Sequence, residues 1–281
     1  MLSFNKESLM ESFFISYKSS QIHYYKAGAG DKLLLCFHGY GEFAESFSFL
    51  EKSIANDFTL LAIDFPFHGK TIWNEELVFT PEDLVTILEK IIEEASFQNS
   101  KISLLGFSMG GRVALHLLQS IPTKIEKIIL LAPDGLKINF WYWLATQTSI
   151  GNKLFYFTAN KPSWFFLLMN TADKLRLVNQ SVFKFANHYL HDKQMRNELY
   201  DRWTVMRQFK PNIKKIKQDI RANNIQLRLL YGRFDKVIRY KNAEKFMNGI
   251  ESNCILSIIN SGHELLKEKN ADEIIRLIKT D

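Results

Sequence analysis

Three residues of this chain have the types and the sequence contexts needed for nucleophilic catalysis, and the first of them is Ser108. It is the centre of Gly106-Phe107-Ser108-Met109-Gly110, which follows an apolar run typical of a strand and precedes a run with helical periodicity. This context predicts a sharp strand-to-helix turn, in which glycines are needed because large side chains two residues from the serine would not fit. The turn would expose the Ser108 Oγ as a nucleophile. The alternative is an ordinary helix start with a capping serine.

A serine is a weak nucleophile until a base accepts its proton. Among the seven histidines, His263 has the best context because it follows the last predicted strand, where a loop at the carboxyl edge of a sheet begins. The imidazole needs a carboxylate to fix its tautomer, and Asp235, which ends the penultimate strand, gives the chain order Ser, Asp, His. Asp134 ends the strand before that and is the rival acid. We predict a catalytic triad of Ser108, His263 and Asp235.

Two main-chain N–H groups are predicted to form an oxyanion hole. One belongs to Met109, at the N-terminus of the helix after Ser108, where the helix favours negative charge. The other is that of Tyr40 in His38-Gly39-Tyr40, which follows the first buried strand. For the side chain of His38 we expect a structural role, namely holding this loop by hydrogen bonds.

The elements that must position these residues alternate between strands and helices in both halves of the chain. The predicted strands cover residues 12–20, 21–29, 32–39, 58–66, 101–108, 124–133, 225–235 and 254–264. The predicted helices cover residues 43–55, 81–97, 110–120, 241–250 and 270–279. The first two strands form an antiparallel pair, and the others are short continuous apolar runs, as expected of parallel strands that are buried on both faces.

The alternation stops between residues 136 and 222, where helical periodicity continues without a convincing strand. We therefore expect an α/β core from residues 1–135 and 223–281, interrupted by an all-helical cap from residues 136–222. The cap holds four of the five tryptophans. Its aromatic clusters either bury one another or form an apolar wall for an acyl chain. Trp143 and Trp164 are the residues expected to bind substrate.

Taken together, these motifs resemble those of the α/β-hydrolase superfamily, in the branch with a helical lid inserted after the sixth strand. The resemblance rests on His38-Gly39, the segment Asp64–Thr71, the segment Gly106–Gly111, Gly232-x-x-Asp235 and Gly262-His263. It implies the α/β-hydrolase fold, a mostly parallel sheet flanked by helices. It also implies a serine hydrolase that cleaves an ester or similar acyl bond of a small, partly apolar substrate and uses no metal or organic cofactor.

The chain departs from the family pattern in places that bear on the pocket more than on the chemistry. Phe67 stands where the family usually has a glycine, and Thr71 stands where it usually has a serine. The common proline a few residues after Asp235 is absent. Related dehalogenases and epoxide hydrolases carry an aspartate nucleophile, so a serine at position 108 argues against their chemistries.

Two other classes of function remain open from the sequence. The same framework hosts lyases of the menaquinone-pathway synthase type, and the stretch Gly111-Arg112-Val113-Ala114, together with a basic cap, would suit their anionic substrate. The second alternative is a non-enzymatic ligand-binding protein with a vestigial triad. The fold alone does not choose among these, because function on this scaffold depends on the pocket.

Composition and charge restrict the class of protein further. With 281 residues, 46% hydrophobic and 23% charged, the chain reads as an ordered globular protein. The net charge of +6 is concentrated between residues 137 and 221, which hold 15 Lys/Arg against 5 Asp/Glu. We interpret this excess as a solvated helix face. The alternative is attraction to an anionic substrate or membrane surface, so peripheral membrane contact stays open. No nucleic-acid-binding motif accompanies the charge, and we expect no nucleic-acid partner.

The expected location is the cytoplasm. The first residues show no basic stretch followed by an apolar run, so we expect no signal peptide. No run of about 18 apolar residues is present, so we expect no stable membrane insertion. Cys36 and Cys254 lie in apolar strand-like runs, which favours two free thiols in a reducing compartment over a disulfide.

Overall fold

The computed structural model describes residues 10–97, 101–137, 140–174 and 190–280. The chain divides into two compact units. The first unit comprises residues 1–75, 80–137 and 209–281, and the second comprises residues 76–79 and 138–208.

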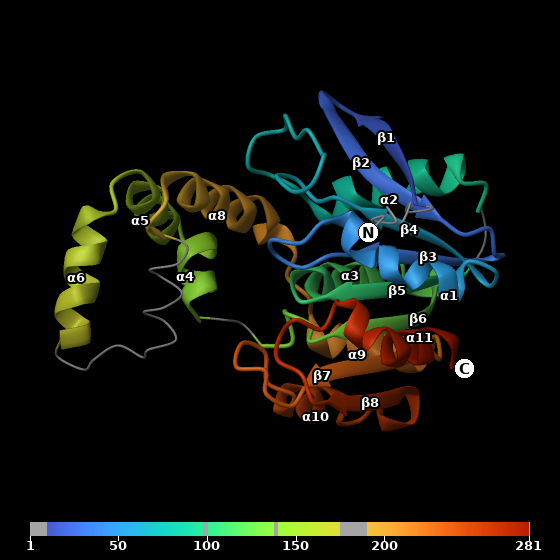
Figure 1. Cartoon of the computed structure of the whole chain (residues 1–281). Helices are drawn as coiled ribbons and strands as arrows, with labels where there is room; N and C mark the ends of the chain where they lie inside the picture. Colours follow the sequence, from blue (N-terminus) through green and yellow to red (C-terminus); the bar gives the residue numbers. More distant parts are fainter. Residues whose placement is uncertain (1–9, 98–100, 138–139, 175–189, 281) are drawn as a thin grey trace, which may run out of the picture. The chain divides into compact units, whose positions relative to one another are not determined.

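The first unit is built around an eight-stranded sheet (Figure 1). Its strands are β1 (Glu11–Tyr17), β2 (Ser20–Ala27), β3 (Lys32–Phe37), β4 (Phe58–Ile63), β5 (Ile102–Phe107), β6 (Ile125–Leu131), β7 (Gln226–Gly232) and β8 (Cys254–Ile259). They lie in the order β1-β2-β4-β3-β5-β6-β7-β8. The pairs β1–β2 and β2–β4 are antiparallel, and all the others are parallel. The predicted antiparallel pair and parallel sheet are both confirmed.

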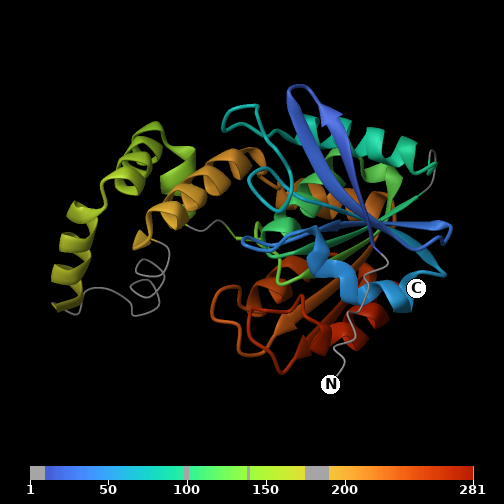
Figure 2. The ribbon, with the colours of Figure 1, turned by 45° about the horizontal axis from the view of Figure 1, so that its top comes forward.

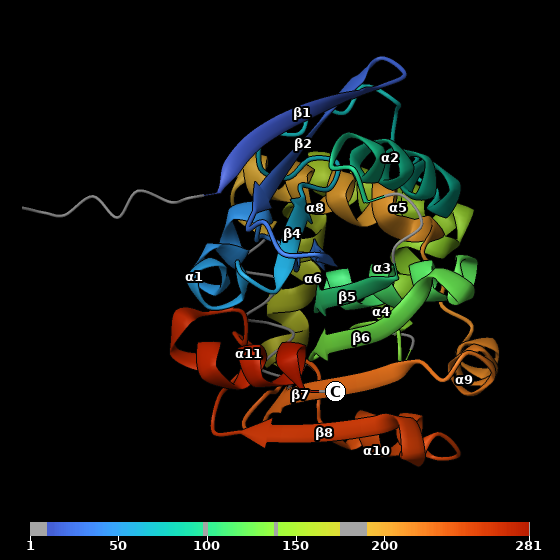
Figure 3. The same ribbon diagram turned by 90° about the vertical axis from the view of Figure 1, so that its right-hand side faces the viewer.

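Helices cover both faces of this sheet (Figure 3). The α-helices of the first unit are α1 (Glu51–Ile54), α2 (Pro81–Glu94), α3 (Met109–Ser120), α9 (Ile213–Ala222), α10 (Lys241–Met247) and α11 (Ala271–Lys279). Its 3-10 turns are η1 (Ala44–Leu50), η2 (Pro122–Lys124), η4 (Glu251–Asn253) and η5 (Glu268–Asn270). Helices α1 and α11 lie on one face, and α2, α3 and α9 lie on the other. Strands covered on both sides are mostly apolar, and every residue of β4 and β5 is buried, including Thr59 and Ser103.

Local sequence signals set several element boundaries. Helix α2 begins where Thr80 and Asp83 exchange hydrogen bonds between side chain and main chain, at 3.1 and 2.9 Å, and Pro81 follows the cap. Strand β2 pairs with β4 only from Tyr24 to Ala27. The turn end of the β1–β2 hairpin therefore extends beyond β4, as Figure 2 shows.

The described residues of the second unit are mostly helical, and residues 76–79 belong to no helix or strand. The unit contains α4 (Phe140–Gln147), α5 (Ser149–Asn160), α6 (Ser163–Lys174), α8 (Lys193–Val205) and the 3-10 turn η3 (Met206–Gln208). One face of α5 packs on α8. The Phe155 ring of α5 contacts the rings of Tyr200 and Trp203 on α8. In addition, Nε of Arg196 on α8 donates to the Ala159 carbonyl of α5 at 2.8 Å. No described helix of either unit is long and apolar enough to cross a membrane.

The second unit is shorter than the cap expected from the sequence. The expected cap ran to residue 222, but α9 groups with the first unit and packs against α3. Residues 138–139 and 175–189 of the expected cap lie outside the described residues. That the helical unit covers the active site stays a prediction.

Candidate active site

Ser108 forms the whole connection between a strand and a helix. Strand β5 ends at Phe107 and α3 begins at Met109, so Ser108 adopts a φ of 50° and a ψ of −112°. A positive φ is strained for a residue with a side chain, and such strain is found mainly at functional sites. The predicted need for glycines is borne out by the packing. A Cβ on Gly106 would lie 2.6 Å from the carbonyl oxygen of Gly110, and a Cβ on Gly110 would lie 2.0 Å from that of Phe37.

Hydrogen bonds to neighbouring elements hold the strained turn in place. The Ser108 N–H donates to the Leu131 carbonyl at 3.0 Å, and the Ser108 carbonyl accepts from the N–H of Asp134 at 2.9 Å. The same carbonyl accepts from Gly111 at 3.0 Å, within the first turn of α3. The backbone of Ser108 is therefore fixed by β6 and the residues after it, while its side chain is half-buried.

His263 approaches Ser108 from the loop after β8. Its Nε2 lies 3.1 Å from the Ser108 Oγ, and its ring packs against the Phe107 ring at 5.4 Å between centroids. The other ring nitrogen, Nδ1, lies 2.8 Å from Oδ2 of Asp235. If Nδ1–H donates to this carboxylate, Nε2 carries a lone pair toward Ser108, which is the tautomer that general-base catalysis needs.

Both carboxylate oxygens of Asp235 have hydrogen-bond partners. Oδ2 faces His263, and Oδ1 accepts from the N–H groups of Val237 and Ile238 at 2.7 and 2.8 Å. The side chain has no exposed surface. A buried carboxylate with this set of donors is fixed in position, and the short loop after β7 supplies two of them.

The rival acid Asp134 has a different set of partners. Its Oδ2 lies 3.5 Å from Nη1 of Arg112, and its Oδ1 accepts from the Gly135 N–H at 2.7 Å. Asp134 lies in the loop after β6, and Arg112 lies in the first turns of α3. The structure thus brings Asp235 to His263 and pairs Asp134 with an arginine.

The predicted oxyanion residues flank Ser108 on two sides. Met109 is the first residue of α3, so its N–H is among the helix-terminal N–H groups that no helix carbonyl can reach. On the other side, a Cβ on Gly39 would lie 3.4 Å from the Ser108 Cβ, which places the His38–Tyr40 loop against Ser108. The ring of His38 holds this loop, as expected, because Nδ1 lies 2.8 Å from the Gly39 carbonyl oxygen and Nε2 accepts from the Phe65 N–H at 3.2 Å.

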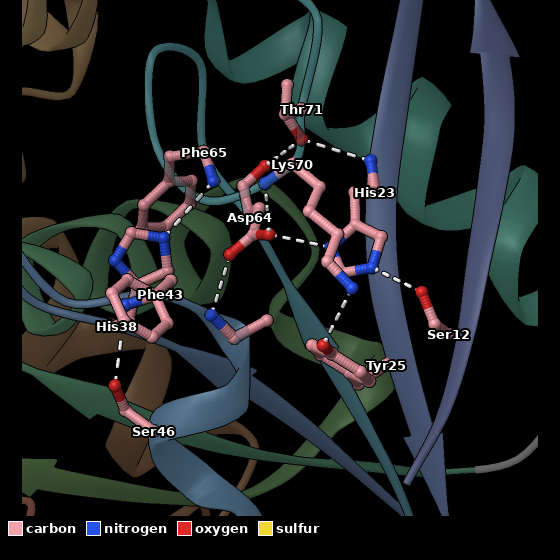
Figure 4. Close-up of polar contacts among 11 residues, drawn as sticks. Ser12, His23, Tyr25, His38, Phe43, Ser46, Asp64, Phe65, Lys70 and Thr71 are labelled. Atoms are coloured by element: carbon pink, nitrogen blue, oxygen red, sulfur yellow. Dashed lines mark hydrogen bonds and ion pairs between the residues drawn. The ribbon is translucent and has the colours of Figure 1, made fainter.

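A buried carboxylate that sequence reasoning did not single out as a site residue supports the same loop (Figure 4). Oδ1 of Asp64 accepts from the N–H of Ala44 at 2.6 Å, and Oδ2 accepts from the N–H of Lys70 at 3.0 Å. Oδ2 also lies 2.6 Å from Nδ1 of His23. The Asp64 carbonyl accepts from Thr71 Oγ1 at 2.7 Å. Asp64 therefore ties together the loops that follow β3 and β4 and the middle of β2.

The hydrogen bonds to Asp64 favour the ionised form of its carboxyl group. Burial alone would raise the pKa of its carboxyl group, but the hydrogen bonds from His23 and from two main-chain N–H groups outweigh burial and hold the pKa below its usual range. Nε2 of His23 lies 2.8 Å from Ser12 Oγ, so a second Ser-His-Asp chain crosses the hairpin. The His23 ring has no exposed surface, and we interpret this second chain as structural.

The two tryptophans predicted to bind substrate lie in the second unit. Trp143 is on α4 with 42% of its surface exposed, and its ring packs near Phe140. Trp164 is on α6, half-buried, and its ring packs near Phe157 and Phe165. Their contact with substrate stays a prediction. Within the described part of the chain, no group of three or more His, Cys, Asp or Glu side chains could hold a metal ion.

Comparison with known proteins places the chain in a family. A family model described as serine aminopeptidase, S33, matches residues 28–270. The chain belongs to this family. It is a serine hydrolase of the α/β-hydrolase superfamily, as the motifs predicted.

Two distant relatives match most of the length of this S33-family chain. It is 23% identical to the uncharacterized hydrolase YugF of Bacillus subtilis (strain 168) over 87% of the chain and 90% of the relative. It is 21% identical to the monoacylglycerol lipase abhd6-B of Xenopus laevis over 84% of the chain and 71% of the relative. Among solved structures, a thermophilic esterase from Thermogutta terrifontis superimposes with a TM-score of 0.67 and 16% identity, covering 96% of this chain and 97% of the esterase. At such identity the structural likeness establishes the fold.

Proposed function

We propose that this protein hydrolyses an ester or similar acyl bond of a small, partly apolar substrate through a covalent acyl-enzyme on Ser108. The observation that carries the proposal is the continuous chain from Ser108 Oγ to His263 Nε2, 3.1 Å, and from His263 Nδ1 to Asp235 Oδ2, 2.8 Å. In the proposed mechanism, His263 takes the Ser108 proton as the Oγ attacks the acyl carbon. The N–H groups of Met109 and Tyr40 hold the oxyanion that forms.

The first half of the cycle ends when His263 passes this proton on to the leaving group, and the second half is attack by water on the acyl-enzyme. His263 gives its proton to the leaving alcohol as the acyl carbon–oxygen bond breaks. A water molecule then attacks the acyl carbon of the acyl-enzyme, with His263 as base, and the acid product leaves with Ser108 protonated again. Asp235 stabilises the imidazolium in both halves and is not itself protonated.

The arrangement around Arg112 favours hydrolysis over the lyase alternative. A lyase of the menaquinone-pathway type would need cationic groups for an anionic substrate. The Arg112 guanidinium is buried and lies 3.5 Å from the Asp134 carboxylate, so its charge is compensated within the protein. The names of two relatives, a monoacylglycerol lipase and an esterase, also agree with ester substrates.

The experiment is a substrate series measured on the wild-type chain and on Ser108→Ala. The series comprises p-nitrophenyl esters from acetate to laurate and, because the family is described as an aminopeptidase, aminoacyl p-nitroanilides. We expect ester turnover in the wild type and loss of about 10⁴-fold or more in Ser108→Ala. Turnover of the anilides without turnover of any ester would overturn the proposed substrate class. Equal ester turnover in the two proteins would overturn the mechanism.

A further inference from the structure

Helix α5 carries apolar side chains on two opposite faces, and among the described residues of the second unit only one of these faces is packed. The packed face includes Asn152, Phe155 and Ala159, which contact α8. At 3.6 residues per turn, Ile150, Leu154 and Phe157 fall on the opposite side of the helix. Their exposed fractions are 83%, 50% and 47%. A surface helix normally presents polar residues on that side.

The exposed stripe continues onto the next helix. The ring of Phe157 lies 6.5 Å from that of Trp164 at the start of α6. Leu167 and Leu168 follow Trp164 by three and four residues and so share its side of α6, with 72% and 58% of their surfaces exposed. We call Ile150, Leu154, Phe157, Leu167 and Leu168 the α5–α6 stripe.

The charged residues in the sequence that carries the stripe, from residue 140 to residue 172, have one sign. From residue 140 to residue 172 the sequence contains ten aromatic residues and no Asp or Glu, and its only charged residues are Lys153 and Lys161. Both lysines are exposed. Lys161 follows the last turn of α5, on the same side as the stripe, and Lys153 lies beside Leu154. Aromatic and aliphatic side chains flanked by lysines are the composition of helices that lie in the interface of an anionic membrane.

We propose that the α5–α6 stripe binds the surface of an anionic phospholipid bilayer, with its apolar side chains at the level of the lipid headgroups and Lys153 and Lys161 against the lipid phosphates. The charge pattern favours this occupant over a second copy of the chain. In a symmetric dimer the stripe would face itself, and residues 140–172 contain no carboxylate that could pair with either lysine.

The experiment is vesicle co-sedimentation of the full chain, with circular dichroism as the check of folding. One set of vesicles contains phosphatidylcholine and phosphatidylglycerol, and the other contains phosphatidylcholine alone. We expect the wild type to bind the anionic vesicles more tightly than the neutral ones, and this binding to weaken as salt is added. Leu154→Glu should lower the partition coefficient by about tenfold or more. Ile72→Glu, which places the same charge at an exposed isoleucine of the first unit, should leave it unchanged.

A second variant keeps the test decisive if Leu154→Glu fails to fold. Lys153→Gln combined with Lys161→Gln alters exposed side chains only and should weaken binding to anionic vesicles by about fivefold per lysine. Absence of wild-type binding to anionic vesicles, or equal binding by Leu154→Glu and Ile72→Glu, would overturn the proposal. A wild-type dimer that Leu154→Glu dissociates, without vesicle binding, would assign the stripe to a second copy instead.

Discussion

Replacing Asp235 by asparagine should destroy turnover while leaving the fold intact. Oδ1 of Asp235 accepts two main-chain N–H bonds, which an asparagine oxygen can still accept. The amide nitrogen would then face Nδ1 of His263, 2.8 Å away, and would donate where the carboxylate accepted. The imidazole would carry its proton on Nε2 and could no longer accept from Ser108. In serine proteases the same change costs about 10⁴-fold in turnover, which corresponds to about 5.4 kcal/mol of transition-state stabilisation.

The matched control is Asp134→Asn, because Asp134 also follows a strand at the carboxyl edge of the sheet. Its carboxylate lies against Arg112 at 3.5 Å. We therefore expect its turnover to fall by less than about tenfold. Both variants are assayed on one p-nitrophenyl ester, and thermal unfolding confirms that both are folded. If Asp134→Asn loses more turnover than Asp235→Asn at equal stability, the assignment of the acid is wrong.

Two further changes test the apolar residues of the second unit and the buried carboxylate of the first. Trp143→Ala or Trp164→Ala should change the ratio of rates on long and short esters by roughly 1–3 kcal/mol, and unchanged ratios in folded variants would make both residues structural. The pKa of Asp64 is lower in the folded state than in the unfolded state, where it is about 4. The ionised Asp64 carboxylate therefore contributes fully to the unfolding free energy above about pH 4, and this contribution is lost as the pH falls through the folded-state pKa. Asp64→Asn should therefore lower the unfolding free energy at neutral pH by about 3 kcal/mol, and the unfolding free energy of this variant should decrease less as the pH falls. The control is Asp31→Asn, which changes an exposed carboxylate and should show neither effect. Denaturant unfolding at a series of pH values measures both effects, and equal acid profiles for the two variants would refute this role of Asp64.

The residues around Ser108 were predictable because their signals are local. The glycines near Ser108 are required by contacts within a few residues and with the adjacent strand, and a strand followed by a helix is readable from periodicity. The position of His263 and Asp235 after the last two strands follows from the rule that the carboxyl ends of parallel strands meet at one edge of the sheet.

The support for the His38–Tyr40 loop was not predictable, because it depends on long-range register. His23 reaches Asp64 because β2 pairs antiparallel with β4, so that Tyr24 lies opposite Ile63. No local pattern gives that pairing. The only available signal was the position of Asp64 at the end of a buried strand, within a segment that resembles a family motif. At Phe67, where the family usually has glycine, the backbone keeps a φ of 62°, so the conformation persists without the residue that favours it.

The residue at which the helical insertion ends could also not be predicted from the sequence. Helical periodicity is the same whether a helix packs on other helices or on a sheet. The strongly amphipathic α9 therefore gave no indication that it belongs with α3 in the first unit. The exposed face of α5 was likewise not predictable, because only the structure shows which of its two apolar faces contacts α8.

The most direct test of the account is covalent labelling of the full chain with a fluorophosphonate, followed by intact-mass and peptide mass spectrometry. The strained turn, the 3.1 Å contact with His263 and the flanking N–H groups predict one adduct per chain, on Ser108. They also predict no adduct on folded Ser108→Ala. Equal labelling of the wild type and of Ser108→Ala would contradict the assignment of Ser108 as the nucleophile, as would an adduct located on any other residue of the wild type.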